Sequence, residues 1–463
     1  MRAVTRRTAL LCALAAGACQ SVGTDQALAP AEAADIAALL RARIDVQRRG
    51  TGGAVGILSA RDFSVVSHGV AARDSSQRVN DESVFQIASL TKIFTALLLT
   101  DAVGRGELAL EEPLDAFVPV PAPRFEGRSI TLLDLATHTG GLPLRPASRQ
   151  DRSQDDPYAG FTEAELYADL QAVELTRAPG AAFGYSNFDY GLLGAALSNR
   201  LGRSYEQLLQ SRILDPLGMR ETTLTPNARM RARRVQGYDS SFEPMRPWDF
   251  GALAPAGGLF STLRDLRKFL ALWVDENDSA LARAARATLA ASRPGDDAET
   301  RMAIGWRVMQ RGGRTVAWSN GSGGGVRSFM SFTSGRGVIA FANMATGVGM
   351  DDIGFRVLDP SYPVDVSAAP QRVAISVPAE ALARYVGEYV YAPGDSMTID
   401  RDAEGLLLLQ GPNRIRLLAE TPTLFFIRED TNITLEFGAA PTERVDAFTL
   451  TQGGQSYVYR RSE

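Results

Sequence analysis

The feature that constrains this chain most is an apolar stretch, residues 87–99, with one hydroxyl and one amine near its start. It reads IASLTKIFTALLL, a pattern that predicts a buried helix. Ser89 and Lys92 are three residues apart, so a helix places them on one face with Cβ atoms about 5–6 Å apart. A serine becomes a nucleophile when a neighbouring base takes its proton, and an unprotonated lysine is such a base. Apolar surroundings favour the unprotonated amine.

The composition supports a chemical role for this lysine. Lysine and arginine together number 49, and only Lys92 and Lys268 are lysines. Arginine cannot serve as a base, because its guanidinium keeps its proton in proteins. A lysine kept inside an apolar stretch therefore indicates chemistry that needs an amine. The alternative is a lysine near a helix start whose amine reaches the surface.

The overall composition is that of a soluble globular protein. The 463 residues suffice for a large domain and a small one, and 45% are hydrophobic and 22% charged. The net charge of −4 and the lack of a basic run give no reason to expect a nucleic-acid partner. His68 and His138 are the only histidines, too few for a histidine-based metal site, and a Ser-His-Asp triad would have to use one of these two. We expect no metal and no cofactor.

Residues 1–22 are predicted to be an export leader. Arginines at positions 2, 6 and 7 precede an apolar run at 9–16, which is too short for an ordinary membrane span. Two processing routes remain open. Residues 16–19 resemble a bacterial lipoprotein cleavage site, which would anchor the protein to a membrane through lipid on Cys19. Plain cleavage near Ala18 would instead leave a soluble periplasmic protein.

Residues 30–360 are predicted to form one α+β domain. A helix is expected first, then two strands, the helix that carries Ser89, a long helical insert, another helix and a group of late strands. In order, these expected elements are 30–49, 54–58, 63–66, 85–99, 108–234, 261–273, 304–309, 315–319, 326–332 and 338–343. Because short turns join the strands, the sheet should be mainly antiparallel and flanked by helices.

A proline-punctuated linker is expected at 361–371, and residues 372–463 are predicted to form a small all-β domain. Eight short alternating strands with turn residues between them favour an antiparallel barrel or sandwich. They are expected at 389–391, 397–399, 406–409, 415–418, 424–427, 434–437, 447–451 and 457–460.

Two further segments carry residues that suit acyl transfer. Tyr185 and Asn187 open a predicted helix, where the phenol can share protons with Ser89 and Lys92 and the amide can orient the lysine and a substrate. The alternative is a core tyrosine followed by an asparagine that caps the helix. The stretch 318–329 reads WSNGSGGGVRSF, and its glycines allow the backbone to approach a ligand closely.

With these motifs the chain resembles the serine β-lactamase and penicillin-recognising family, on its class C β-lactamase, DD-peptidase and esterase side. The resemblance runs from about residue 34 to residue 358 and implies a β-lactamase/transpeptidase-like fold. It also implies that Ser89 is acylated, that Lys92 is the base and that Tyr185 takes part in proton transfer. Asn187 would orient the lysine and the substrate. The segment HTGGLP, residues 138–143, is a landmark of the family that is mainly structural.

The family's third motif departs from its pattern. The expected substrate-binding residues are Ser319, Asn320, Gly321 and Ser322, and Ser319 stands where the family has a lysine or histidine. N–H groups of Ser322 and Ser89 would form the oxyanion hole. The missing cation makes a β-lactam or D-Ala-D-Ala substrate less expected, although Arg327 offers a charge nearby.

The sequence therefore favours an exported serine hydrolase that forms an acyl-enzyme on Ser89 and acts as an esterase or amidase on small substrates. Its partner would be a small ester, amide or peptide. Two alternatives remain open: a β-lactamase or D-Ala-D-Ala peptidase, and a catalytically inactive relative that binds cell wall.

Overall fold

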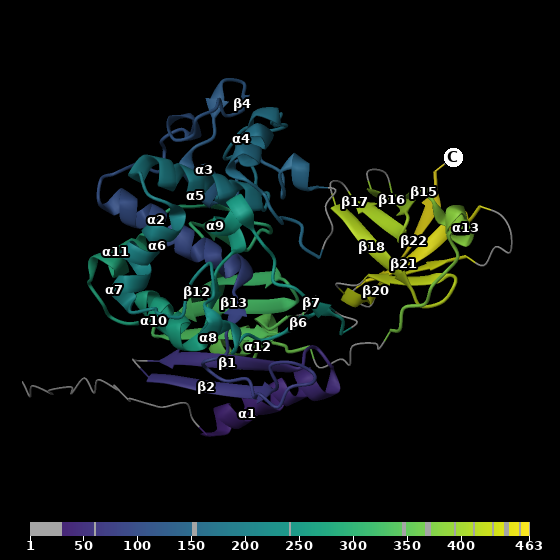
Figure 1. Ribbon diagram of the computed structural model, residues 1–463, viewed down its shortest axis with the longest axis horizontal. Coiled ribbons are helices and arrows are strands. Elements are labelled where there is room, and N and C mark those ends of the chain that lie inside the picture. Colours follow the sequence, from purple (N-terminus) through teal and green to yellow (C-terminus); the bar gives the residue numbers. More distant parts are fainter. Residues whose placement is uncertain are drawn as a thin grey trace, which may run out of the picture.

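The computed structural model (Figure 1) describes residues 30–59, 62–150, 155–239, 242–344, 349–365, 372–392, 395–410, 413–427, 430–438, 444–452 and 455–462. The predicted leader, residues 1–22, lies outside the described residues. So do residues 366–371 of the predicted linker. Among the described residues, no helix has the length and apolar character needed to cross a bilayer.

The centre of the larger part is one eight-stranded sheet in which every neighbouring pair is antiparallel, as the sequence predicts. Strands from both ends of this part meet in the sheet, because β1 pairs with β14. In spatial order the strands are β2 (Asp62–Gly69), β1 (Gly52–Ser59), β14 (Arg336–Ala342), β13 (Val326–Thr333), β12 (Arg314–Gly323), β11 (Arg307–Arg311), β10 (Thr300–Ala303) and β9 (Ser292–Pro294).

Both faces of the sheet are covered by helices. Alternating residues of the strands fill two separate apolar clusters, as the period-two pattern requires. α10 (Leu263–Val274) packs on one face. On the other lie α1 (Pro30–Arg41), which continues as the π-helix Ala42–Val46, and α12 (Asp351–Leu358). Figure 1 shows α1 beneath β1 and β2 and the helical insert on the opposite side.

The expected strand 304–309 is right only in its second half: residues 307–309 lie in β11, whereas residues 304–306 form the turn between β10 and β11. Gly305 has φ +81°, and a Cβ built there would lie 2.7 Å from the Ala96 Cβ. The chain therefore reverses tightly against the helix that carries Ser89, a conformation that favours glycine. The reversal places Arg307 at the start of β11.

The insert is a group of mostly short helices around α2 (Thr91–Gly104) and α5 (Asn187–Leu201). Side-chain caps define several of their starts, including capping boxes at Thr131, Thr162 and Ser204. The other helices of this part are α3 (Leu132–Ala136), α4 (Glu163–Ala172), α6 (Tyr205–Leu209), α7 (Asp215–Leu217), α8 (Ala228–Arg231), α9 (Ala254–Gly257) and α11 (Ala280–Ala287). Two-stranded pairs join β3 (Phe85–Gln86) to β8 (Phe260–Ser261), β4 (Arg124–Phe125) to β5 (Arg128–Ser129) and β6 (Gly237–Tyr238) to β7 (Pro244–Met245).

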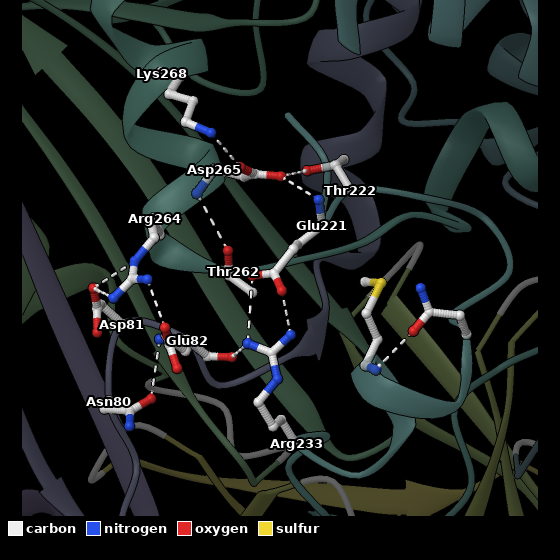
Figure 2. A network of polar contacts seen from close by, with 12 residues as sticks. Asn80, Asp81, Glu82, Glu221, Thr222, Arg233, Thr262, Arg264, Asp265 and Lys268 are labelled. Carbon is white, nitrogen blue, oxygen red and sulfur yellow. Dashed lines mark hydrogen bonds and ion pairs between the residues drawn. The ribbon is translucent and has the colours of Figure 1, made fainter. Parts of the chain in front are cut away.

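A polar network ties the segment before β3 to the start of α10 (Figure 2). Arg264 binds the carboxylates of Asp81 and Glu82. The second lysine belongs to this network: Lys268 Nζ donates to Asp265 Oδ1 at 2.8 Å and to Gly218 O at 2.6 Å. Lys268 therefore has a structural role on the surface of α10, unlike Lys92.

The C-terminal part is a closed eight-stranded antiparallel barrel, so the predicted all-β domain is confirmed as a barrel. Its core is rich in aromatic rings, with Tyr385, Phe425, Phe437 and Phe448 among the buried side chains. The strands are β15 (Gly387–Ala392), β16 (Asp395–Asp402), β17 (Gly405–Gln410), β18 (Asn413–Ala419), β19 (Leu424–Ile427), β20 (Asp430–Phe437), β21 (Ala447–Gln452) and β22 (Gln455–Arg461), preceded by the short helix α13 (Ala379–Leu382).

Candidate active site

Ser89 stands just before α2, the helix around which the insert packs. A 3₁₀ turn, Ala88–Leu90, leads directly into α2, and Ala88 adopts φ +47°, a conformation uncommon for a residue with a Cβ. Ser89 is partly exposed, while every other residue from Ser83 to Ala102 is buried. The chain therefore presents one hydroxyl of this apolar segment to the outside.

Lys92 lies one turn further along and is only 3% exposed. Its Nζ is 3.1 Å from Ser89 Oγ, 2.7 Å from Asn187 Oδ1 and 2.8 Å from the Ala256 carbonyl oxygen. Burial holds the pKa of Lys92 well below its usual value; the charge of Arg307 adds to this shift and Asp189 opposes it. The helix thus places serine and lysine in contact, as their spacing predicts.

The three contacts suit a neutral amine. An unprotonated lysine has two N–H groups and one lone pair. The oxygens of Asn187 and Ala256 can only accept hydrogen bonds, so they take the two N–H groups. The lone pair is then directed to the remaining neighbour, the hydroxyl of Ser89.

Tyr185 reaches Ser89 from the other side. Its hydroxyl donates a hydrogen bond to Ser89 Oγ at 2.7 Å. Burial raises the pKa of Tyr185, against smaller opposing effects of the Ser89 contact and of Arg307, so the phenol keeps its proton and can donate it. Ser186 caps α5 by accepting from the N–H of Asp189, which fixes Tyr185 and Asn187 on either side of the cap.

His138 is a buried neighbour of Tyr185, and the two ring centroids are 4.4 Å apart. Its Nδ1 accepts a hydrogen bond from the Ser186 N–H at 3.1 Å. Burial holds the pKa of His138 well below its usual value, and the charge of Arg307 adds to the effect. His138 therefore packs as a neutral ring. His68 lies on β2, earlier in the chain, and its Nε2 is 2.8 Å from Asp45 Oδ2.

The third motif runs along β12, whose open edge faces the start of α2. β11 pairs with β12 only as far as Trp318. A Cβ built on Gly321 would lie 2.6 Å from Ile87 O and 3.0 Å from Ser89 N, so the backbone of β12 passes directly beside Ser89. Ser319 and Gly321 face this side because side chains alternate along a strand.

The neighbouring residues of the motif face away. Asn320 Nδ2 donates to Asp351 Oδ2 of α12 at 2.5 Å. Ser322 lies opposite Arg327 in the register of β12 and β13. A Cβ built on Gly349 would be 3.5 Å from Arg327 Cδ, which places that arginine beside the start of α12. The structure therefore directs the Asn320 side chain toward α12, and Arg327 lies at the same place.

Within the described residues, no three His, Cys, Asp or Glu side chains gather as a metal site requires. A sequence model described as "Beta-lactamase" matches residues 35–356, more than half of the chain. The chain belongs to the β-lactamase family. Residues 371–459 match a second model, described only as a domain of unknown function (DUF3471).

Named relatives of this β-lactamase-family chain are hydrolases. The D-alanyl-D-alanine-carboxypeptidase/endopeptidase AmpH of Escherichia coli is 28% identical over 297 residues, which cover 61% of this chain and 76% of that protein. A β-lactamase of Pseudomonas fluorescens is 31% identical over 202 residues, covering 43% and 53%. The family resemblance and the assignment to a hydrolase family are both confirmed.

Solved structures share the fold. A β-lactamase/D-alanine carboxypeptidase of Yersinia pestis, complexed with citrate, is 25% identical with a TM-score of 0.57, covering 66% of this chain and 92% of that one. The octameric penicillin-binding protein homologue of Pyrococcus abyssi has a TM-score of 0.63 at 20% identity, covering 92% and 99%. The second match extends the fold similarity over most of the chain.

Three site residues of this β-lactamase-family chain were not indicated by its sequence. Ala256 contributes only its backbone carbonyl oxygen, which the residue type does not indicate. Tyr158 accepts a hydrogen bond from Asn187 Nδ2 at 2.7 Å. Arg307 lies beside Tyr185, its guanidinium carbon 5.7 Å from that ring centroid and 5.0 Å from the centroid of Trp318. Tyr158 and Arg307 stand outside every motif found in the sequence, so only the folded chain reveals their positions in the site.

Proposed function

We propose that the chain is a serine hydrolase that forms an acyl-enzyme on Ser89. The observation that carries this proposal is that Ser89 Oγ has two proton-exchanging neighbours, Lys92 Nζ at 3.1 Å and the Tyr185 hydroxyl at 2.7 Å. A hydroxyl placed between a base and a second proton carrier is the arrangement that activates a serine. The partly exposed position of Ser89 supports access for a substrate.

The acylation step follows from these contacts. The Lys92 lone pair takes the Ser89 hydroxyl proton while Ser89 Oγ bonds to the substrate carbonyl carbon. The π electrons of the carbonyl move onto its oxygen, where the N–H groups of Ser89 and Ser322 stabilise the charge. Tyr185 gives its proton to the leaving group as the carbon–leaving-group bond breaks, and takes up the proton held by Lys92. Water then cleaves the acyl-enzyme in the same manner.

Small neutral esters and amides are the first substrate class. Ser319 faces the Ser89 side of β12 and brings no charge to it, so a substrate carboxylate would find a neutral hydroxyl there. A charge-assisted hydrogen bond is about twice as strong as a neutral one. A serine at this position therefore weakens the binding of neutral substrates less than the binding of anionic ones.

Carboxylate-bearing peptides and β-lactams are a second class, which Arg307 favours. This guanidinium lies within 6 Å of the ring centroids of Tyr185, Phe183 and Trp318. It has a partner in Asp296, whose Oδ2 is 3.2 Å from its Nε. The relatives named as β-lactamases and as a D-alanyl-D-alanine carboxypeptidase act on substrates of this class.

The test uses a chromogenic short-chain ester and a chromogenic β-lactam with the full-length protein and with Ser89→Ala. We expect ester hydrolysis by the wild type, none by Ser89→Ala, and a mass increase equal to the acyl group on the peptide that contains Ser89. Hydrolysis that persists in Ser89→Ala would exclude the acyl-enzyme. Absence of both hydrolysis and acylation across a wide substrate panel would favour the inactive cell-wall-binding alternative.

We also propose that the chain is exported and processed near Cys19. The N-terminal residue of the mature protein, read by mass spectrometry, tests this directly. If Cys19 carries lipid, Cys19→Ala should move the protein from the membrane to the soluble fraction; if cleavage is of the plain kind, fractionation should not change. Full-length protein in the cytoplasm of its host would contradict both routes.

A further inference from the structure

The Asn187 amide has two chemically different ends, and they face two different residues. Its Oδ1 is 2.7 Å from Lys92 Nζ, and its Nδ2 donates to the Tyr158 hydroxyl at 2.7 Å. Reversal of this amide would direct an N–H donor at Lys92. A protonated lysine would reject that donor, but a neutral lysine would accept it through its lone pair. The lone pair would then be unavailable to the proton of Ser89.

Tyr158 is held firmly enough to decide the orientation. It is 1% exposed, with its ring centroid 5.3 Å from that of Phe250 and 6.0 Å from that of Trp248. Its turn is tied to the segment that carries these two rings, because the Ala252 N–H donates to Phe161 O at 2.7 Å. The phenol oxygen therefore occupies a fixed position.

That oxygen acts as an acceptor. Burial raises the pKa of Tyr158, so the phenol stays neutral, while Arg145 opposes the shift through its charge and a hydrogen bond to the phenol. The Arg145 guanidinium carbon is 5.7 Å from the ring centroid. A guanidinium can only donate. Asn187 Nδ2 also donates to this oxygen, so the end of the amide that faces Tyr158 is the N–H end.

We propose that Tyr158 is a positioning residue that holds the Asn187 amide with its oxygen toward Lys92 and so keeps the Lys92 lone pair free for Ser89. This inference rests on the proposed function, because it assigns Lys92 the task of taking the Ser89 proton. Tyr158 itself touches neither Ser89 nor the reacting atoms. It acts through Asn187 alone, which gives the experiment a clear internal check.

The first test is Tyr158→Phe, which removes one oxygen and keeps the ring. We expect kcat for a short-chain ester to fall about tenfold, the effect of one misplaced hydrogen bond. The acid limb of the kcat–pH profile should move to lower pH, because an amide N–H facing Lys92 stabilises the neutral amine. KM should change little, since the aromatic ring is retained.

The matched control is Tyr205→Phe. Tyr205 is also buried, and its hydroxyl is 2.6 Å from Thr95 Oγ1, on the same helix as Lys92. This variant removes the same atom from the same kind of environment without touching Asn187. We expect its acid limb to coincide with that of the wild type. An equal shift in both variants would overturn the proposal by showing that loss of a buried hydroxyl near α2 is sufficient.

The second test is the same substitution in an Asn187→Ala background. If Tyr158 acts only through Asn187, adding Tyr158→Phe to Asn187→Ala should change kcat less than about twofold. A further tenfold loss in that background would overturn the proposal. Should Tyr158→Phe fail to fold, Arg145→Met removes one donor to the same oxygen and should move the acid limb in the same direction. A folded Arg145→Met with an unmoved limb would then overturn it.

Ser89→Ala separates this inference from the proposed function. If Ser89→Ala keeps its activity, the acyl-enzyme proposal fails first. If Ser89→Ala is inactive while Tyr158→Phe keeps the kcat and pH profile of the wild type, only the role of Tyr158 is excluded.

Discussion

Lys92 Nζ and Asn187 Oδ1 are 2.7 Å apart, although 95 positions of sequence separate the two residues. α2 and α5 pack side by side so that the first turns of both helices meet. Because a carboxamide oxygen and a backbone carbonyl occupy the two N–H groups of a neutral lysine, the contact directs the remaining lone pair to Ser89. This contact supports the proposed role of Lys92 as the base.

Lys92→Arg should abolish activity, because a guanidinium carries the charge of a lysine but cannot serve as a base. Loss of a general base costs about 100- to 10,000-fold in rate. Initial rates with a short-chain ester measure the loss. Lys268→Arg is the matched control, since Lys268 contacts Asp265 and Gly218 and an arginine can make both contacts. Substantial activity in Lys92→Arg would contradict the role given to the amine.

Gly321→Ala should separate β12 from the start of α2. Its added Cβ would lie 2.5 Å from Ser328 Oγ and 2.6 Å from Ile87 O, which is backbone and cannot yield. If the backbone of β12 helps to bind the oxyanion, kcat should fall about 100- to 1,000-fold. Gly104→Ala is the control, because among the described residues no atom beyond the adjacent part of its own helix lies within 4 Å of its added Cβ. Unchanged kcat in a folded Gly321→Ala would argue against an oxyanion hole at this position.

Arg307→Gln should change the preference between substrate classes. If Arg307 attracts a substrate carboxylate, kcat/KM for a β-lactam should fall about tenfold more than kcat/KM for a neutral ester. The ratio of the two kcat/KM values cancels any effect of Arg307 on Lys92, because that effect is the same for both substrates. Ser319→Lys should move the ratio in the opposite direction. Arg311→Gln is the control, since Arg311 lies at the other end of β11 and pairs with Asp359. An unchanged ratio in Arg307→Gln would argue against a role of Arg307 in binding the substrate carboxylate and would favour the neutral substrates that Ser319 suggests.

The sequence predicts the antiparallel sheet, the all-β C-terminal domain as a barrel or a sandwich, and the contact between Ser89 and Lys92, because each depends on local periodicity or on the spacing along one helix. Strands at the C-terminal end were found at all eight expected places, since turn residues separate them clearly. The break at Gly305 was missed, because its cause is the packing of the turn against Ala96, which lies far away in the sequence.

The parts of the site that could not be predicted are those made by tertiary contact alone. The Ala256 carbonyl is invisible in any side-chain pattern. Arg307 carries no motif, so its position beside Tyr185 follows only from the turn that starts β11. Asn320 lies in a motif, yet its side chain faces α12, because alternation along β12 and the position of Asp351 decide its direction.

Asp351 should make stability depend on pH in a direction opposite to that of most carboxylates. Burial raises the pKa of Asp351 from 3.8 to about 6, against the hydrogen bond from Asn320 and the charge of Arg327. The folded state therefore binds the proton more tightly than the unfolded state, and stability falls as pH rises from about 4 to about 6, by up to about 3 kcal/mol. Asp351→Asn should remove this loss, so its stability relative to the wild type should be higher at pH 7.5 than at pH 4.5. Urea unfolding followed by tryptophan fluorescence measures this, because all four tryptophans, at positions 248, 273, 306 and 318, precede the barrel.

Asp359→Asn is the control for this experiment. Hydrogen bonds from Ser361 and Arg311 lower the pKa of Asp359 to about 2. The stability linked to Asp359 is complete above its unfolded pKa and is lost only as pH falls toward 2, below the window measured. The difference between Asp359→Asn and the wild type should therefore be the same at pH 4.5 and pH 7.5. If Asp351→Asn also shows a constant difference, the partly buried carboxyl of Asp351 does not hold its proton more tightly in the folded state, and its contact with Asn320 is that of an ordinary ionised aspartate.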